Sequence, residues 1–263
     1  MEMYEQFPVQ RFTSEGKEDV EDIVIREIPL TIIFNDQELV TLICSPADLK
    51  YMAVGFLFSE GLLQTREEIK KIMVDERKGL VRIETNQQKD GDLVFKRLIT
   101  TGCGRGASLY SLADAQTLAQ VKSDLKVLPS DIFRLVKEFQ GKSQIFKETG
   151  GVHGAALCDK NGVLIFKEDI GRHNAIDKII GECMLNGITM EERIMITSGR
   201  ISSEIMFKIV KRNIPILVSR SAPTNIGVKL ANELGLTLIG FVRGSRMNVY
   251  ANAWRIIQEG VTV

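Results

Sequence analysis

Apolar and polar positions in the first third of the chain predict a hairpin followed by a helix. Over residues 21–44, short apolar and polar stretches alternate on both sides of a turn at Phe34-Asn35-Asp36, as in two paired strands. The period then changes, because apolar side chains recur every three or four positions from Leu49 to Phe56. Ser45 is predicted to cap this helix, and Gly61 to end it.

The middle of the chain contains the expected boundary between two domains. Further strands are predicted over residues 78–100, followed by a helix from Leu109 to about Lys122. The segment from Leu125 to Gly141 has a proline start signal and a regular apolar face, so we interpret it as a joining helix. This predicts an N-terminal domain at residues 1–124 and a C-terminal domain at residues 125–263.

Beyond residue 145 the pattern alternates between strands and helices. The expected strands are Val152–Leu157, Val163–Phe166, Ile194–Thr197, Ile216–Ser219 and Leu236–Val242, and the expected helices are Asn174–Leu185, Ser203–Arg212 and Ile226–Leu234. The last three strands are short, mostly apolar and separated by helices, which is typical of a largely parallel sheet covered on both faces. The predicted fold class is α/β, with a three-layer C-terminal domain and a smaller N-terminal α+β domain.

Composition narrows the class of protein. With 44% apolar and 26% charged residues, the chain can bury a large core, and no apolar run approaches the ~20 residues that span a bilayer. The formal net charge is zero, so the chain lacks the overall positive charge that non-specific nucleic-acid binding requires. The N-terminus shows no export signal, and the four cysteines form no Cys-x-x-Cys pair, so we expect a cytoplasmic protein.

Cys103 is the strongest candidate for chemistry. It lies in a predicted loop at residues 100–108, where glycines take the place of the apolar neighbours that a buried cysteine usually has. The fixed positive charge of Arg105 favours the thiolate, so we predict a reactive sulfur; an exposed loop cysteine without chemistry is the alternative. The other three cysteines follow apolar patterns that predict core positions: Cys44, Cys158 and Cys183.

Polar residues cluster where the predicted strands lead into helices. Each of these loops carries at least one arginine, and the set is Arg172, Arg200, Arg220, Arg243 and Arg246. Because ligands bind beyond the carboxyl ends of parallel strands, the arginines predict a phosphate-binding rim, which His153 and His173 could also face. Solvated loop charges are the alternative.

A zinc hydrolase is not predicted. Such a site needs three ligands and a carboxylate base, and the deaminase pattern His-x-Glu with Pro-Cys-x-x-Cys is missing. His153 is followed by Gly154-Ala155, and His173 by Asn174-Ala175. A Walker A loop and a Gly-x-Gly-x-x-Gly motif after a strand are missing as well, and we expect no structural metal.

Several motifs together resemble those of one family. They are Ser45-Pro46 with Ala53-Val54-Gly55-Phe56-Leu57-Phe58-Ser59-Glu60-Gly61, Thr149-Gly150-Gly151-Val152-His153, Glu168-Asp169-Ile170-Gly171-Arg172-His173-Asn174-Ala175-Ile176-Asp177-Lys178, Ser198-Gly199-Arg200-Ile201-Ser202-Ser203-Glu204, Ser221-Ala222-Pro223-Thr224 and Gly240-Phe241-Val242-Arg243. The resemblance covers roughly residues 21–250 and is to the FdhD/NarQ family, the sulfur-carrier accessory proteins of formate dehydrogenase.

The resemblance implies a sulfurtransferase. Such a protein takes sulfur from a cysteine desulfurase as a persulfide, here on Cys103, and passes it to the molybdenum cofactor in its bis-molybdopterin guanine dinucleotide form, before the cofactor enters formate dehydrogenase. It also implies a C-terminal half similar to the cytidine deaminase fold. Many family members carry Cys-x-x-Cys in the loop, whereas this chain has only Cys103 there, so the acceptor or an outside reductant would have to discharge the persulfide.

The resemblance also implies a binding site for the cofactor or a guanine nucleotide. Its strongest candidates follow the last parallel strand: Phe241, Val242, Arg243, Gly244, Ser245 and Arg246. Further candidates are His153, Arg172, His173, Asn174 and Arg200. Two other functions stay open, a non-enzymatic chaperone for the molybdenum cofactor and a small-molecule hydrolase of deaminase ancestry, and the sequence does not decide whether the chain forms a homodimer.

Overall fold

The computed structural model describes residues 2–86 and 118–257. The predicted cysteine loop at residues 100–108 lies outside the described residues, as does most of the helix predicted from Leu109. Residues 118–122, where that helix was predicted to end, are not helical. In the described residues no helix is long and apolar enough to cross a membrane.

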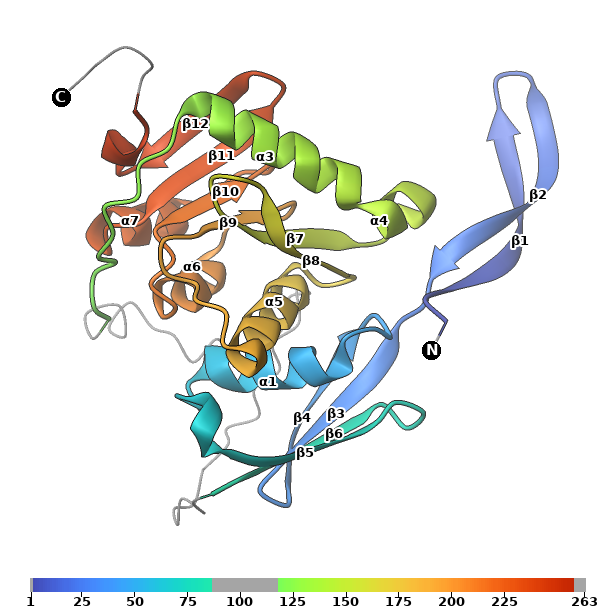
Figure 1. Cartoon of the computed structure of the whole chain (residues 1–263). Coiled ribbons are helices and arrows are strands. Elements are labelled where there is room, and N and C mark those ends of the chain that lie inside the picture. The colour runs from blue at the N-terminus through green and yellow to red at the C-terminus, as the bar shows by residue number, and fades with distance from the viewer. Residues whose placement is uncertain (1, 87–117, 258–263) are drawn as a thin grey trace.

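A six-stranded sheet forms the centre of the C-terminal part (Figure 1). Its strands, in spatial order, are β12 (Arg246–Ala251), β11 (Thr237–Arg243), β10 (Ile216–Ser219), β9 (Ile194–Thr197), β7 (His153–Cys158) and β8 (Val163–Asp169). The three strands predicted to be parallel, β9, β10 and β11, are parallel. β7–β8 and β11–β12 are antiparallel because hairpins too short for a crossover join them, and β7–β9 is antiparallel as well. The sheet is therefore mixed, and not largely parallel as predicted.

Helices cover both faces of this sheet, which confirms the predicted three layers. On one face lies α3 (Pro129–Lys142), whose predicted apolar face is buried against the strands. On the other face lie α5 (Arg172–Asn186), α6 (Ser203–Val210) and α7 (Asn225–Glu233). Two short elements complete this half, α4 (Gln144–Thr149) and a 3₁₀ turn at Ala253–Arg255.

The N-terminal part adds a second sheet and one helix. Its strands, in spatial order, are β4 (Gln37–Cys44), β3 (Ile28–Phe34), β6 (Leu80–Thr85) and β5 (Ile69–Asp75), with a 3₁₀ turn at Arg66–Glu68 before β5. The helix α1 (Leu49–Glu60) packs between this sheet and α5, and one apolar core runs through all three. The division into two domains at residue 124 therefore stays a prediction, and the two parts share one apolar core.

Two glycines let α1 and α5 approach closely. A Cβ atom on Gly55 would lie 1.8 Å from the carbonyl oxygen of Asp177, and one on Gly181 would lie 1.9 Å from that of Tyr51. Both distances are far below van der Waals contact, so only glycine fits at the crossing.

The predicted hairpin and helix of the N-terminal part are present, with one correction. The turn lies between β3 and β4, and Gly61 ends α1 in the left-handed conformation with φ of 79°. Ser45, however, does not cap α1, which begins after Asp48. The Ser45 hydroxyl instead donates to the carboxylate of Asp169, 2.9 Å away, because that distant partner offers a buried charge.

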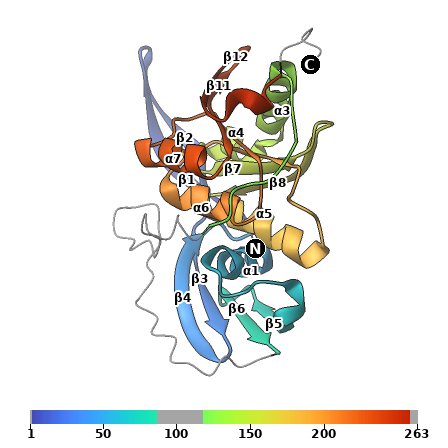
Figure 2. The ribbon, with the colours of Figure 1, turned by 90° about the vertical axis from the view of Figure 1, so that its left-hand side faces the viewer.

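A separate ribbon at the N-terminus was not predicted. Strands β1 (Tyr4–Thr13) and β2 (Gly16–Ile25) pair only with each other and stand away from the body (Figures 1 and 2). Strand β5 and helix α4 were also missed by the sequence patterns.

Candidate functional site

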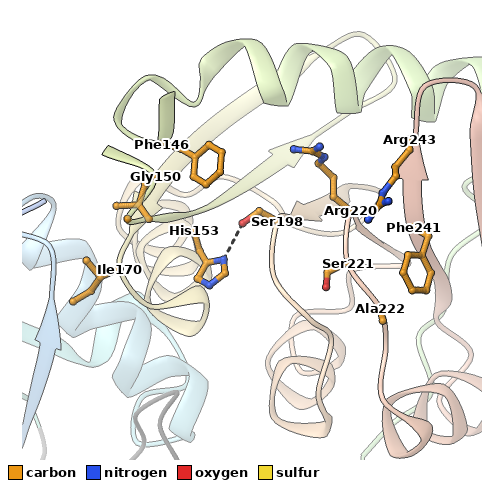
Figure 3. Close-up of a pocket in the computed structure, with 12 residues that line it drawn as sticks. Phe146, Gly150, His153, Ile170, Ser198, Arg220, Ser221, Ala222, Phe241 and Arg243 are labelled. Carbon is orange, nitrogen blue, oxygen red and sulfur yellow. Dashed lines mark hydrogen bonds between the residues drawn. The ribbon is translucent and has the colours of Figure 1, made fainter. Parts of the chain in front are cut away.

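A pocket lies at the edge of the large sheet where β8, β9, β10 and β11 end and β7 begins. Its volume is about 540 Å³, within the range of small-molecule sites. Three predicted site residues line this strand-end pocket, namely His153, Phe241 and Arg243 (Figure 3). Phe146, Ile170, Ser198, Arg220 and Ser221 also line it.

His153 presents a neutral imidazole to the pocket. Its Nδ1 lies 3.1 Å from the hydroxyl of Ser198, which also accepts a hydrogen bond from the backbone N–H of Gly154 (Figure 3). Burial lowers the pKa of His153, and the charge of Arg172 lowers it further, while Asp169 acts in the opposite direction. The imidazole is therefore uncharged at neutral pH, and any positive charge in the pocket comes from arginine.

Arg220 supplies one of these charges. It follows β10, its backbone N–H donates to the carbonyl oxygen of Thr197, and its side chain reaches toward α3 (Figure 3). There, with the Gln140 amide turned so that its oxygen faces Arg220, that oxygen accepts from both terminal nitrogens, at 3.1 and 3.2 Å. Arg220 belongs to the predicted arginine rim but not to the predicted cofactor-binding set. Arg220 directly follows an apolar strand, and this position could have predicted that it lines the pocket. Ser198 and Ser221 also follow apolar strands.

Arg243, which lines the pocket, and Arg246, which lies outside its lining, add further positive charge at this edge. They are directly opposite each other in the ladder between β11 and β12, and both side chains are exposed. Like charges in that arrangement are unfavourable unless an anion lies between them. Two neighbouring guanidinium groups are able to bind an oxyanion such as a phosphate.

Phe241 has an unusual backbone conformation. Its φ is 52°, in the left-handed region that aromatic residues rarely adopt, and it lies at an irregularity in the ladder between Gly240 and Arg243. The Phe241 N–H donates to the carbonyl oxygen of Ser221, which helps hold this conformation. Strained residues of this kind are concentrated at ligand sites, and here the strain places an aromatic ring in the pocket wall (Figure 3).

The other residues predicted from the last strand do not line the pocket. The Val242 side chain is buried in the core beneath α3, so only its backbone could reach a ligand. Gly244 and Ser245 form the exposed turn before β12, with Gly244 at φ of 57°.

Four predicted residues from the neighbouring loops also lie outside the pocket lining. Arg200 is exposed. The Arg172 side chain packs against Gly199, where a Cβ atom would lie 2.8 Å from it. The Asn174 amide donates to Asp169 at 2.8 Å and to the carbonyl oxygen of Ile43 at 2.9 Å, which is a structural role.

His173 faces helix α6 instead. Its Nδ1 lies 3.3 Å from the carboxylate of Glu204. Burial, followed by the charges of Lys208, Arg172 and His153, lowers the pKa of His173 to about 3, so it is neutral and offers no positive charge to a phosphate.

A buried ion pair, through its hydrogen bonds to Ser45, connects the pocket edge to the N-terminal part. Asp169 and Lys178 are both fully buried, with Oδ2 and Nζ 2.7 Å apart. Asp169 also accepts hydrogen bonds from the backbone N–H and hydroxyl of Ser45 and from the N–H of Gly171. Much of the long motif at residues 168–178 therefore builds this connection and does not contact the pocket.

The three described cysteines occupy core positions, as predicted. Cys44, Cys158 and Cys183 are completely buried, and burial is the main cause that raises the pKa of each thiol to about 12. Within residues 2–86 and 118–257 no cysteine can therefore carry a thiolate at physiological pH, and no group of His, Cys, Asp and Glu could hold a metal ion. The Cys103 role stays a prediction.

The protein has a mixed three-layer α/β fold with a pocket lined by two arginines at the strand ends. Comparison with known proteins identifies its family. The model of the FdhD/NarQ family matches residues 25–257, and the chain belongs to that family. It is 43% identical to "Sulfur carrier protein FdhD" of Bacillus subtilis (strain 168), over 90% of this chain and 91% of that protein. It is 38% identical to the protein of the same name from Staphylococcus aureus (strain MRSA252), over 96% of both.

A solved structure has the same fold. It is that of a putative formate dehydrogenase accessory protein from Desulfotalea psychrophila, with a TM-score of 0.81 and 26% sequence identity. The likeness covers 97% of this chain and 100% of that one, so it includes both parts of the molecule.

Proposed function

We propose that this protein is a sulfur carrier that serves formate dehydrogenase, receiving sulfur on Cys103 from a cysteine desulfurase and transferring it to the molybdenum cofactor in its bis-molybdopterin guanine dinucleotide form. The observation that carries the proposal is the strand-end pocket, where Arg220 and Arg243 lie beside Phe241. The names of the relatives support the sulfur-carrier role. The name of the structural neighbour supports the link to formate dehydrogenase.

The pocket suits a guanine dinucleotide by its chemistry. Guanidinium groups bind phosphate oxygens through paired N–H donors, and Arg220 and Arg243 provide two such groups in the lining. Arg246 lies opposite Arg243 in the β11–β12 ladder, outside the lining. The Phe241 ring offers a flat face on which a base can stack. The neutral His153 and Ser198 add hydrogen-bonding groups without adding charge.

Sulfur uptake is an exchange reaction at Cys103. Its thiolate attacks the terminal sulfur of the donor's persulfide, the donor's S–S bond breaks, and the donor cysteine leaves as a thiolate. The sulfur then remains on Cys103 as a persulfide. Delivery as sulfide requires two electrons, and because the loop has no second cysteine, the acceptor or an outside reductant of the thiol class supplies them.

The first prediction tests the pocket. Arg243→Ala and Arg220→Ala should each weaken GDP binding by roughly 1.5–3 kcal/mol, the range for charge-assisted hydrogen bonds, measured by isothermal titration calorimetry. Arg200→Ala is the matched control, because Arg200 is exposed outside the pocket lining and should change affinity by a few tenths of a kcal/mol at most. Unchanged affinity in both pocket variants, with an intact circular dichroism spectrum, would remove the pocket as the nucleotide site.

The same variants separate loading from delivery. After incubation with a cysteine desulfurase and cysteine, Arg243→Ala should still gain sulfur on Cys103, detected by mass spectrometry of the intact protein and its peptides, yet fail to activate formate dehydrogenase. A chaperone without transfer chemistry needs the pocket but takes up no sulfur, so this measurement also separates the two functions.

A further inference from the structure

The ribbon of β1 and β2, residues 4–25, is called here the acidic arm. Its two strands pair over ten positions and have no third strand beside them in the described part of the chain. A two-stranded ribbon is marginally stable in water by itself. The arm nevertheless stands clear of the body (Figures 1 and 2). On one of its faces Phe7 and Val24 are 44% and 42% exposed, and on the other face Phe12 is 72% exposed. Exposed apolar side chains on a ribbon with no third strand indicate a binding partner.

One face of the acidic arm has the composition of an interface. Directly opposed residues share a face, and the register pairs Phe7 with Asp22, Val9 with Val20, and Glu5 with Val24. Four apolar side chains thus lie together on this face, flanked by carboxylates at its edges. An apolar centre with a charged rim is the usual arrangement at protein–protein contacts.

The charge of the acidic arm indicates the kind of partner. Residues 4–25 contain six carboxylates and two basic side chains, a formal charge of −4, whereas the whole chain is neutral. Two such arms would repel each other, so side-by-side pairing of arms from two copies is unfavourable. The arm instead fits a basic protein surface with an apolar centre.

The base of the acidic arm adjoins the strand-end pocket. Ile25 at the end of β2 lies against Gly151, where an added Cβ atom would be 2.6 Å from the Ile25 side chain, and β2 also packs against α4. Gly151 and Phe146 of α4 both line the pocket. A protein held by the arm would therefore be next to the mouth of the pocket.

We propose that the acidic arm docks the enzyme that receives the cofactor, in its cofactor-free form. This inference rests on the proposed function. A guanine dinucleotide cofactor is polyanionic, so the empty enzyme that accepts it must present a basic entrance. The arm has the opposite charge and extends from the edge of the pocket, so it holds that entrance close to the cofactor.

The test measures binding of purified cofactor-free formate dehydrogenase to the full chain by biolayer interferometry. Phe7→Thr/Val24→Thr removes two apolar side chains while keeping residues that favour strands, and should weaken binding about tenfold or more. Glu5→Gln/Asp22→Asn should also weaken it and reduce its dependence on salt. Leu164→Thr in β8, which is 46% exposed, is the matched control and should bind as the unmodified protein does.

GDP titration and light scattering accompany these measurements. Unchanged GDP affinity in the arm variants, together with weaker enzyme binding, supports the proposal. Equal enzyme binding by both arm variants and the unmodified protein overturns it while leaving the pocket function intact. A change from dimer to monomer in the arm variants overturns it in favour of a second copy as the occupant. Failure of the unmodified protein to bind GDP would instead count against the proposed function.

Discussion

Cys103→Ala should abolish activation of formate dehydrogenase while leaving GDP binding unchanged. Only a thiolate attacks a persulfide, and alanine has no sulfur to receive the atom. The loss should therefore be complete and not partial, unlike the graded loss expected from one pocket arginine. The measurement is formate dehydrogenase activity in cells that lack their own carrier protein and express the variant, with GDP titration of the purified protein as the check on folding.

Substitution of the core cysteines provides the matched control. Cys158→Ala removes a thiol that is fully buried and whose pKa is about 12, so it should cost stability on the order of 1 kcal/mol and leave sulfur transfer in place. Sulfur mapped by mass spectrometry to Cys158 and missing from Cys103 would contradict this assignment. Activation that survives Cys103→Ala would favour the chaperone without transfer chemistry.

The strands of the large sheet could be predicted because burial and local pattern agree there. All four residues of β9 and of β10 are buried, so each strand reads as a short apolar run between polar loops. The acidic arm lacks this agreement. Its residues are almost all exposed, so no buried face imposes alternation, and Pro8 argues against a strand unless it lies on an edge.

The candidate site divides in the same way. Position at the end of a strand correctly predicted that His153, where β7 begins, would share one pocket with Phe241 and Arg243, where β11 ends. Position alone could not predict that the Asn174 amide donates to the carboxylate of Asp169. That carboxylate is buried by packing from the other half of the chain, which a local pattern does not reveal. Ser45 failed as a cap for the same reason, because a contact 124 residues away outweighed a local preference.

That contact leads to the prediction with the largest expected effect on stability. Asp169→Ala should destabilise the protein by about 3–5 kcal/mol, because it leaves the ammonium of Lys178 buried without its counter-charge. The hydroxyl and N–H of Ser45 lose their acceptor at the same time. Urea unfolding of the purified protein, followed by circular dichroism, measures the difference.

Two comparisons separate this effect from the general cost of losing an ion pair. Arg82→Ala removes a pair of similar length with Asp36, 2.7 Å, but those side chains are 34% and 74% exposed, so the loss should stay below about 1 kcal/mol. Asp169→Ala/Lys178→Met removes both buried charges and should be less destabilising than Asp169→Ala alone. If the double variant is as unstable as the sum of the two single ones, the buried lysine is not the source of the cost. The lost hydrogen bonds of Ser45, Gly171 and Asn174 would then be what ties the pocket edge to the N-terminal part.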